Sequence, residues 1–270
     1  MSNFPVTGVM IMVHVRLLWL VLGLVFVTHH GKADELPSEK LANRPHVVML
    51  VAEQEYETMQ SLKRFSKDRE EAYRFTIVAE DSSDRNRLIG LDSLRNADLM
   101  VVSVRRRTLP TNQLALIREF VSQGKPVIGI RTASHAFSLR SKKPPAGRAA
   151  WQDFDQLVFG GNYTNHHGND LQVKLSFAES GSKHPIVQGI DADKNYSSSS
   201  SLYRVSPLIE GAKVLMRGQV KGHPAEPVAW TYRRADGGKS FYTSLGSTED
   251  FRGLVLPQLL ENALVWGLSE

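Results

Sequence analysis

Cysteine is absent from all 270 residues of the sequence. Its absence excludes disulfide bonds, a thiolate nucleophile, and every metal or iron–sulfur site with cysteine ligands. A chain of this length can bury a core large enough to hold its fold without cross-links. Stability must therefore come from packing, and any catalysis must use other side chains.

The sequence also lacks a strong net charge and a basic arm. The formal net charge is +5, and basic residues are mixed with acidic ones along most of the chain. No helix-turn-helix or RNA-binding signature is present, so we expect no nucleic-acid partner. The zinc-protease motif HExxH and the serine-hydrolase motif GxSxG are missing as well.

The longest apolar run lies near the N-terminus, at residues 17–27, directly after Arg16. Gly31 and Ala33 have the spacing of a signal-peptidase site, and the run is shorter than the about 20 residues of a membrane span. We expect residues 1–33 to be a signal peptide, with export to the periplasm or the outside and no stable membrane span after cleavage. Loss of Arg16 and Lys32 then lowers the net charge from +5 to +3. An uncleaved N-terminal anchor or a misassigned start codon is the alternative.

Residues 34–45 are polar, contain two prolines, and are typical of a linker. Apolar runs of strand length then alternate with segments of helical periodicity. Strands are expected at 46–52, 75–79, 97–103 and 126–130, and helices at 56–65 and 111–124. This alternation predicts an α/β fold with a mostly parallel sheet, right-handed crossovers and helices on both faces.

The pattern changes after about residue 140. Residues 171–177 alternate apolar and polar side chains, as in a half-exposed strand. Further strands are expected at 213–216, 227–232 and 240–244, and a helix at 257–266. These extra strands look antiparallel, and no linker-like stretch divides residues 46–268, so we expect one domain.

Two segments carry polar side chains of the kind found at ligand sites. Residues 126–137 run from a buried strand into a helix that Thr132 would cap, and residues 159–168 form a Gly-rich loop with two adjacent histidines. In an open α/β sheet, ligands bind outside the carboxyl ends of the strands. The segment after residue 130 is therefore expected to form one wall of a pocket, with the histidine loop opposite.

In their order, several motifs resemble the ThuA-like (trehalose-utilisation type) family. These are Glu53-Gln-Glu-Tyr56, Gly129-Ile-Arg-Thr-Ala-Ser-His135, Gly160-Gly-Asn-Tyr-Thr-Asn-His-His-Gly168, His184-Pro185, Ser201-Leu-Tyr203, Pro227-Val-Ala-Trp230 and Phe241-Tyr-Thr-Ser-Leu-Gly246. The resemblance covers nearly all of residues 46–268. It implies a doubly wound, flavodoxin-like sheet, as in class I glutamine amidotransferases, and a role in the metabolism of sugars or their derivatives.

Two departures accompany this resemblance. The amidotransferase relatives carry a nucleophilic cysteine in the turn after the fourth strand, and this chain has no cysteine. An active glutaminase is therefore not expected. Many family members have histidine where this chain has Ser247.

The candidate catalytic residues are His135, His166, His167 and Glu55. His135 is expected near a helix N-terminus, which lowers the pKa of a histidine and favours a neutral base; a backbone-bonded helix cap is the alternative. Adjacent histidines on an extended segment point opposite ways, so His166 and His167 should not both face one pocket. The candidate substrate-binding residues are Arg131, Ser134, Arg105, Asn162, Tyr163, Tyr203 and Ser247. Of the run Arg105-Arg-Arg107, we expect one arginine to be functional and the others solvated or paired with acids.

No cofactor is expected. If a divalent metal binds, its ligands would come from His135, His166, His167 and His184. Their spacing matches no known ligand motif, so hydrogen bonds to sugar hydroxyls and to backbone are the favoured roles.

These observations leave two functions open. One is an exported enzyme that isomerises, epimerises or hydrolyses a sugar or an oxidised sugar derivative through a histidine-rich polar pocket. The other is a non-catalytic module of the same fold that binds carbohydrate or a partner. The sequence does not decide whether the chain forms a homo-oligomer.

Overall fold

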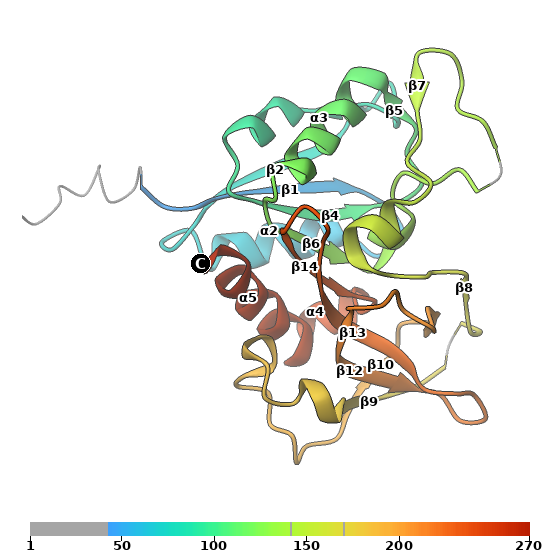
Figure 1. Ribbon diagram of the computed structural model, residues 1–270. Helices are drawn as coiled ribbons and strands as arrows, with labels where there is room; N and C mark the ends of the chain where they lie inside the picture. Colours follow the sequence, from blue (N-terminus) through green and yellow to red (C-terminus); the bar gives the residue numbers. More distant parts are fainter. Residues whose placement is uncertain (1–42, 141, 170) are drawn as a thin grey trace, which may run out of the picture.

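The computed structural model describes residues 43–140, 142–169 and 171–270 (Figure 1). The expected signal peptide and most of the expected linker lie outside the described residues. One sheet contains β1 (His46–Ala52), β2 (Arg74–Glu80), β3 (Leu88–Ile89), β4 (Leu99–Val104), β6 (Val127–Ile130), β9 (Val173–Phe177), β10 (Tyr196–Ser198), β12 (Lys213–Gln219), β13 (Glu226–Arg233) and β14 (Lys239–Thr243). Two small ribbons pair β5 (Leu109–Pro110) with β7 (Arg148–Ala149) and β8 (Asn165–His166) with β11 (Tyr203–Arg204).

The centre of the sheet is parallel. Strands β2, β1, β4, β6 and β14 lie side by side in that order and all run the same way. They are the second, first, third, fourth and fifth parallel strands of the chain, which is the flavodoxin order. In such a sheet the ligand site lies where the strand order reverses, here between β1 and β4. The expected flavodoxin-like α/β fold is confirmed.

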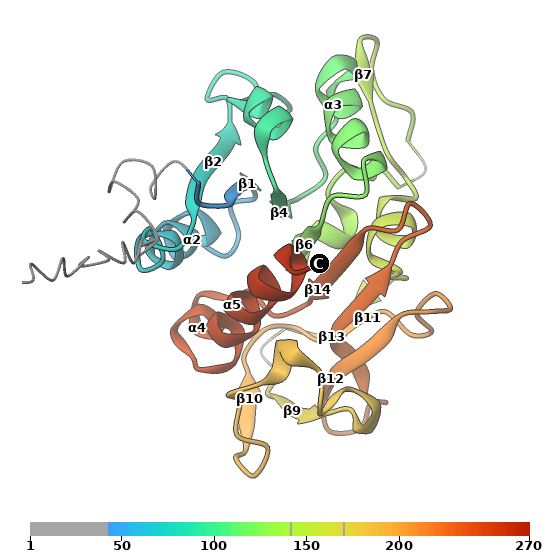
Figure 2. The ribbon, with the colours of Figure 1, turned by 60° about the vertical axis from the view of Figure 1, so that its left-hand side comes forward.

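The antiparallel strands continue the same sheet beyond β14. Strands β13, β12, β9 and β10 follow in that order, each antiparallel to its neighbour. They lie together below α5 (Val255–Leu268) in Figure 2. The expected antiparallel C-terminal half is therefore present, except that β14 itself pairs parallel with β6.

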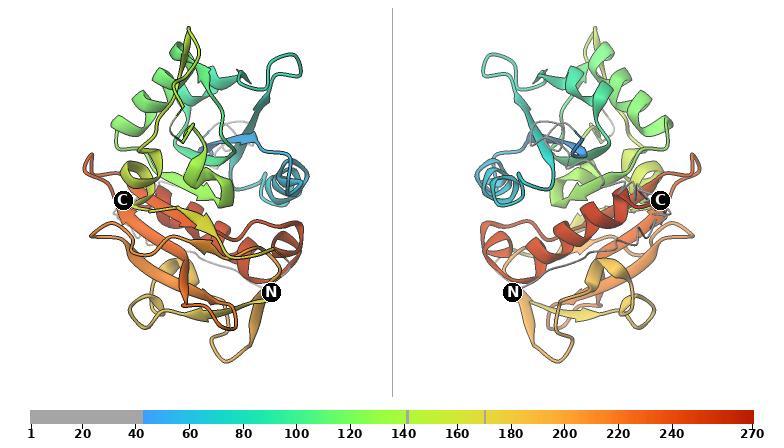
Figure 3. Two further views of the ribbon diagram at one scale, coloured as in Figure 1. Left: turned by 90° about the vertical axis from the view of Figure 1, so that its right-hand side faces the viewer. Right: turned by 90° about the vertical axis from the view of Figure 1, so that its left-hand side faces the viewer.

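Helices cover both faces of the parallel strands. Helices α2 (Thr58–Lys67), α4 (Thr248–Arg252) and α5 lie on one side and α3 (Thr111–Ser122) on the other (Figure 3). Along β1, Val47, Met49 and Val51 belong to the core under α2 and α5, and the alternate residues to the core under α3. A strand buried on both faces needs an apolar residue at every position, which explains the continuous apolar run in the sequence.

The helix expected after the fourth strand is not formed. Instead the chain takes the short 3-10 helix η2 (Arg131–His135), with no side-chain cap at its start. Thr132, expected as the cap, has a buried hydroxyl without a hydrogen-bond partner among the described residues. The other short helices are η1 (Leu91–Asn96), η3 (Asp155–Phe159), η4 (Glu179–Gly181) and η5 (Pro185–Val187).

Gly129 in β6 is required by the packing of the core. A Cβ atom at this position would lie 2.5 Å from the ring of Phe159 and 2.8 Å from that of Tyr242. The absence of a side chain lets these two rings lie against the strand that leads into η2.

Across the described ranges, no helix is long and apolar enough to cross a membrane.

Candidate functional site

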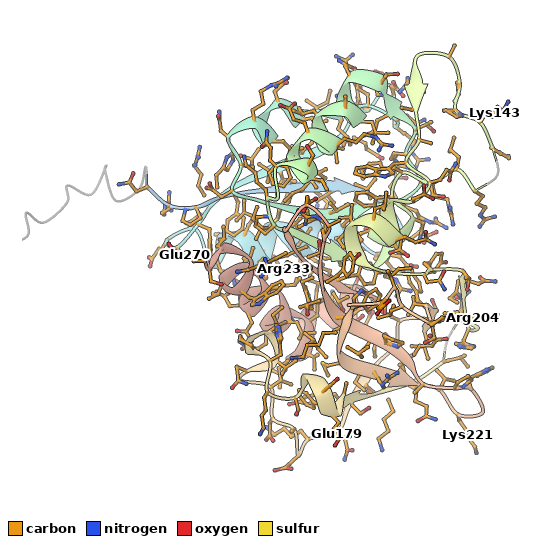
Figure 4. The ribbon with its side chains drawn as sticks, viewed as in Figure 1. Lys143, Glu179, Arg204, Lys221, Arg233 and Glu270 are labelled. Carbon is orange, nitrogen blue, oxygen red and sulfur yellow. The ribbon has the colours of Figure 1, made fainter. Side chains whose placement is uncertain are left out.

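Polar side chains gather at the carboxyl ends of β1, β4 and β6. In Figure 1, β1 points toward the side of the molecule on which β8 lies, so the segment with β8 faces these strand ends. In Figure 4, Lys143 in the loop before β7 and Arg204 in β11 lie on that same side. Two adjoining cavities open there.

The large cavity has a volume of about 560 Å³. From the strand ends it is lined by Glu55, Tyr56, Arg105, Arg106, His135 and Arg140. From the segments around β8 and β11 it is lined by Tyr163, Asn165, His166, Asn169, Ser201 and Tyr203. The volume is in the range of small-molecule sites, and the lining is polar and cationic.

The small cavity has a volume of about 280 Å³ and adjoins the large one. Arg106, His135, Arg140 and Tyr163 line both cavities. The rest of its wall carries hydroxyl, amide and carboxyl groups, from Ser134, Ser138, Gln152, Asp153, Asp155, Gln156, Asn162 and Thr164. Such groups hydrogen-bond well to hydroxyl-rich ligands.

His135 is held with one ring nitrogen occupied. Its Nδ1 lies 3.1 Å from the hydroxyl of Ser134, and this hydroxyl donates to the carbonyl oxygen of Arg131 at 3.3 Å. The other ring nitrogen, Nε2, has no hydrogen-bond partner among the described residues.

Burial lowers the pKa of His135 well below 6.5, and the charges of Arg106 and Arg105 act in the same direction. The imidazole is therefore neutral near pH 7. The expected low pKa has a different cause from the one inferred from sequence, because η2 has only five residues and supplies no long helix dipole.

Tyr163 forms the wall next to His135. The two rings are stacked, with centroids 4.6 Å apart and planes 28° apart. Tyr203 lies 4.6 Å from Tyr163 in turn, so three rings form a continuous surface. The backbone N–H of Tyr163 donates to the carboxylate of Asp155 at 2.8 Å, which fixes the loop that carries the ring.

Arg131 lies beneath the large cavity and does not line it. Its guanidinium group sits between the rings of Tyr56 and Tyr203, 4.4 and 4.7 Å from their centroids. It donates to the carbonyl of Ser244 at 2.8 Å and to the hydroxyl of Ser201 at 2.9 Å. The structure thus uses Arg131 to fix the tyrosine wall, whereas the sequence indicated direct contact with substrate.

The three consecutive arginines have different environments. Arg105 pairs with Glu55, and Arg107 pairs with Glu80. Arg106 forms no ion pair with a described carboxylate, and its closest polar contact is the carbonyl of Ser138 at 3.4 Å. Glu55, expected as a catalytic group, lines the large cavity but is bound to Arg105.

The four histidines considered as metal ligands are not brought together. His166 lines the large cavity, and its Nδ1 is hydrogen-bonded to the carbonyl oxygen of His167 at 2.6 Å. His167 instead packs its ring 4.3 Å from that of His223. His184 caps η5 and packs against Trp266. Within the described ranges, no three His, Asp or Glu side chains are grouped so that they could hold a metal ion.

Two further candidates, Ser247 and Asn162, form hydrogen bonds to the backbone. Ser247 caps α4: its hydroxyl accepts from the N–H of Asp250 at 3.1 Å, and it lines neither cavity. Asn162 lines the small cavity and donates to the carbonyl of Pro207 at 3.1 Å.

Sequence reasoning missed Asp155, Arg106 and Arg140. Burial raises the pKa of Asp155 to about 7, although the N–H of Tyr163 opposes this shift. Arg106 and Arg140 have left-handed backbones, with φ of 47° and 59°. Only the run of arginines offered a sequence signal, and it did not distinguish Arg106 from its neighbours.

A model of the ThuA family, described as trehalose utilisation, matches residues 46–267. A ThuA-like protein from Bacteroides uniformis has a similar structure, with 15% identity and a TM-score of 0.62 over 84% of this chain and 94% of that chain. A ThuA-like protein from Parabacteroides merdae has 12% identity and a TM-score of 0.55, over 84% of this chain and 90% of that chain. The structure of PurLQS from Thermotoga maritima has 11% identity and a TM-score of 0.50, over 83% of this chain and 99% of that chain. At these identities the structures support the fold alone. No curated protein matches the sequence.

Proposed function

This chain belongs to the ThuA family, which implies a role in trehalose utilisation or carbohydrate metabolism, and we propose that its two adjoining cavities bind and convert a sugar or an oxidised sugar derivative. The observation that carries the proposal is the position of His135. It lines both cavities as a neutral imidazole with Nε2 free of any described partner. The family membership supports the substrate class, and the hydrogen-bonding lining supports a polyhydroxylated ligand.

In this proposal His135 is the base. A neutral imidazole can accept a proton at Nε2 from a sugar hydroxyl or from a carbon next to a carbonyl group, and can return it at another position. In the proposed state Nδ1–H donates to the hydroxyl of Ser134, and this contact at 3.1 Å holds the ring plane. Such proton transfer fits isomerisation or epimerisation of a keto-sugar. Hydrolysis through a cysteine is excluded, since the chain has none.

The alternative is a non-catalytic module that binds carbohydrate. One observation favours it: the only hydrogen bond of His135 to a described side chain is with Ser134, and Glu55 is bound to Arg105 rather than to the histidine. A base is often oriented by a carboxylate, and the described site supplies none to His135.

Deuterium exchange separates the two functions. Keto-sugars and aldoses would be incubated with the protein in D₂O and followed by NMR. We expect exchange at the carbon next to the carbonyl with the wild type and a loss of at least about 100-fold with His135→Asn. His184→Asn is the matched control, because His184 lies against Trp266 and lines neither cavity. Binding without exchange in any sugar would instead support the module.

We also propose that the protein is exported after cleavage at Ala33. The support is the apolar run at residues 17–27 with Arg16 before it and small residues at the expected cleavage position. Mass analysis of the protein from its native host would test this. An N-terminus at Asp34 is expected, and an intact N-terminus in the cell envelope would mean an anchor instead.

A further inference from the structure

Arg106 and Arg140 are the cations of the site that lack an acidic partner. Both line the large and the small cavity. Arg105 beside them is paired with Glu55, but neither Arg106 nor Arg140 lies within ion-pair distance of a carboxylate in the described part of the chain. Two positive charges therefore meet at the junction of the cavities, and neither is paired with a described carboxylate, although Asp153 and Asp155 also line the small cavity.

The environment of Arg106 disfavours its own charge. Its side chain is half-buried, and its one polar contact with a described residue is the distant carbonyl of Ser138. Burial lowers the pKa of Arg106, and the charges of Arg140 and Arg105 lower it further. The charge of an anion bound between these side chains would offset both effects.

The backbone is strained at the same two residues. Arg106 and Arg140 have φ of 47° and 59°, a conformation that costs a residue with a Cβ atom on the order of 1 kcal/mol. Their strain is held by the segment that carries His135: the N–H of Arg106 donates to the carbonyl of His135 at 3.2 Å, and that of Arg140 to the hydroxyl of Ser138 at 3.3 Å. Strain of this kind gathers at functional sites, where it aims a side chain at a ligand.

We propose that Arg106 and Arg140 form an anion subsite at the junction of the two cavities, which holds the carboxylate or phosphate group of an acidic sugar. This inference rests on the proposed function, because it names the substrate class of the same site. Guanidinium groups bind the oxygens of such anions in pairs. The hydroxyl and amide groups of the two walls then contact the sugar, and the anion sits next to His135.

Calorimetric titration tests the subsite. The probes are glucose, glucuronate, glucose 6-phosphate and inorganic phosphate. The proteins are the wild type, Arg106→Gln, Arg140→Gln and, as a matched control, Arg217→Gln. Arg217 is exposed on β12 and lines neither cavity. Circular dichroism and thermal melting would establish that all four proteins fold.

We expect the wild type to bind at least one acidic sugar about tenfold or more tightly than glucose, with an affinity that falls as salt rises. Arg106→Gln and Arg140→Gln should each lose about tenfold or more in affinity for the acid and clearly less in affinity for glucose, whereas Arg217→Gln should behave as the wild type. Comparison of glucuronate with glucose 6-phosphate identifies the anion as carboxylate or phosphate.

The outcomes separate this inference from the proposed function. If glucose binds as tightly as both acids, or if the two variants keep full affinity for the acid, the anion subsite is wrong while sugar binding stands. If inorganic phosphate alone binds, and binds more weakly to the two variants, the subsite stands and the sugar proposal falls. Absence of binding by every probe overturns both.

Discussion

The imidazole of His135 stacks on the phenol ring of Tyr163, with centroids 4.6 Å apart and 28° between the ring planes. His135 follows β6, and Tyr163 lies in the loop before β8, so the contact joins the strand ends to the histidine-bearing segment. The stack contributes to the burial that keeps the imidazole neutral. His135 thereby stays neutral in the wall that the two cavities share.

Tyr163→Ala should raise the pKa of His135 toward 6.5, because removal of the ring lets water reach the imidazole. We expect Tyr163→Phe, which keeps the ring, to leave the pKa near its wild-type value. The alanine variant should also lose about 0.5–1.5 kcal/mol of stacking energy. NMR titration of the His135 ring protons measures the pKa, and equal values in both variants would remove the stack as a cause.

Arg106→Gln should also raise the pKa of His135, because Arg106 is the first of the charges that lower it after burial. Folded His135 resists a proton that the unfolded chain takes up below pH 6.5, so the contribution of His135 to wild-type stability is fully present above that pH and falls as the pH drops below it. The stability of the variant relative to the wild type should therefore rise as the pH falls. Urea unfolding from about pH 7 to about pH 5 would measure this rise, and parallel curves for the two proteins would contradict the prediction.

Asp155→Asn should stabilise the protein at neutral pH and not in acid. Burial raises the pKa of Asp155 from 3.8 to about 7, so the folded state keeps a proton that the unfolded chain releases. The wild type therefore loses stability as the pH rises through that window, by up to about 4 kcal/mol for three pKa units. An asparagine oxygen can still accept the N–H of Tyr163 but cannot ionise.

The stability difference between Asp155→Asn and the wild type should accordingly grow from about pH 4 to about pH 7, as measured by urea unfolding. Asp153→Asn is the control, since Asp153 lies two residues away and is exposed. A difference that does not change with pH would mean that Asp155 is ionised in the folded protein throughout.

Arg131→Lys should destabilise the fold by about 2–3 kcal/mol, because a lysine cannot supply the two forked hydrogen bonds or lie flat between two rings. The guanidinium group bonds to Ser244 and Ser201 and stacks between Tyr56 and Tyr203. Arg217→Lys, at an exposed position, should change stability by less than about 0.5 kcal/mol. Equal unfolding midpoints for the two variants would show that the fork is dispensable.

Gly129→Ala should destabilise the protein by about 1–3 kcal/mol, because the new methyl group overlaps the rings of Phe159 and Tyr242. Gly168→Ala is the matched control, as an added Cβ there meets only Leu171, at 3.6 Å, and the backbone φ is not positive. Thermal unfolding of both variants gives the comparison. Similar melting temperatures would indicate that the core yields at Gly129 without cost.

The strands of the parallel sheet could be predicted from the sequence, because a strand that is buried on both faces has a continuous run of apolar residues. Residues 46–52 were expected as a strand and form β1 with those bounds. The helix at 111–124 was recognisable from its apolar spacing and forms α3. By contrast, residues 240–244 look like the strands before them, and only their neighbour in space, β6, makes β14 parallel.

The site was predictable as a place but not as a set of interactions. His135, Tyr163 and His166 line one cavity, as their positions after strands and on the Gly-rich loop indicated. Arg131 and Ser247 were also expected in the site as polar side chains, yet Arg131 is enclosed between two rings and Ser247 caps a helix. Sequence spacing does not reveal the partners of Arg131, because one of them, Ser244, lies 113 residues away, whereas the capping partner of Ser247 is only three residues along the chain.

The sequence alone determined the absence of cysteine chemistry, the α/β alternation, and the edge of the sheet where polar side chains collect. These properties depend on residue types and on local periodicity. The tertiary structure alone decided that Arg105 and Arg107 are paired while Arg106 joins Arg140 at the cavities. Charge balance depends on which side chains meet in space, and that depends on the packing of distant strands and loops.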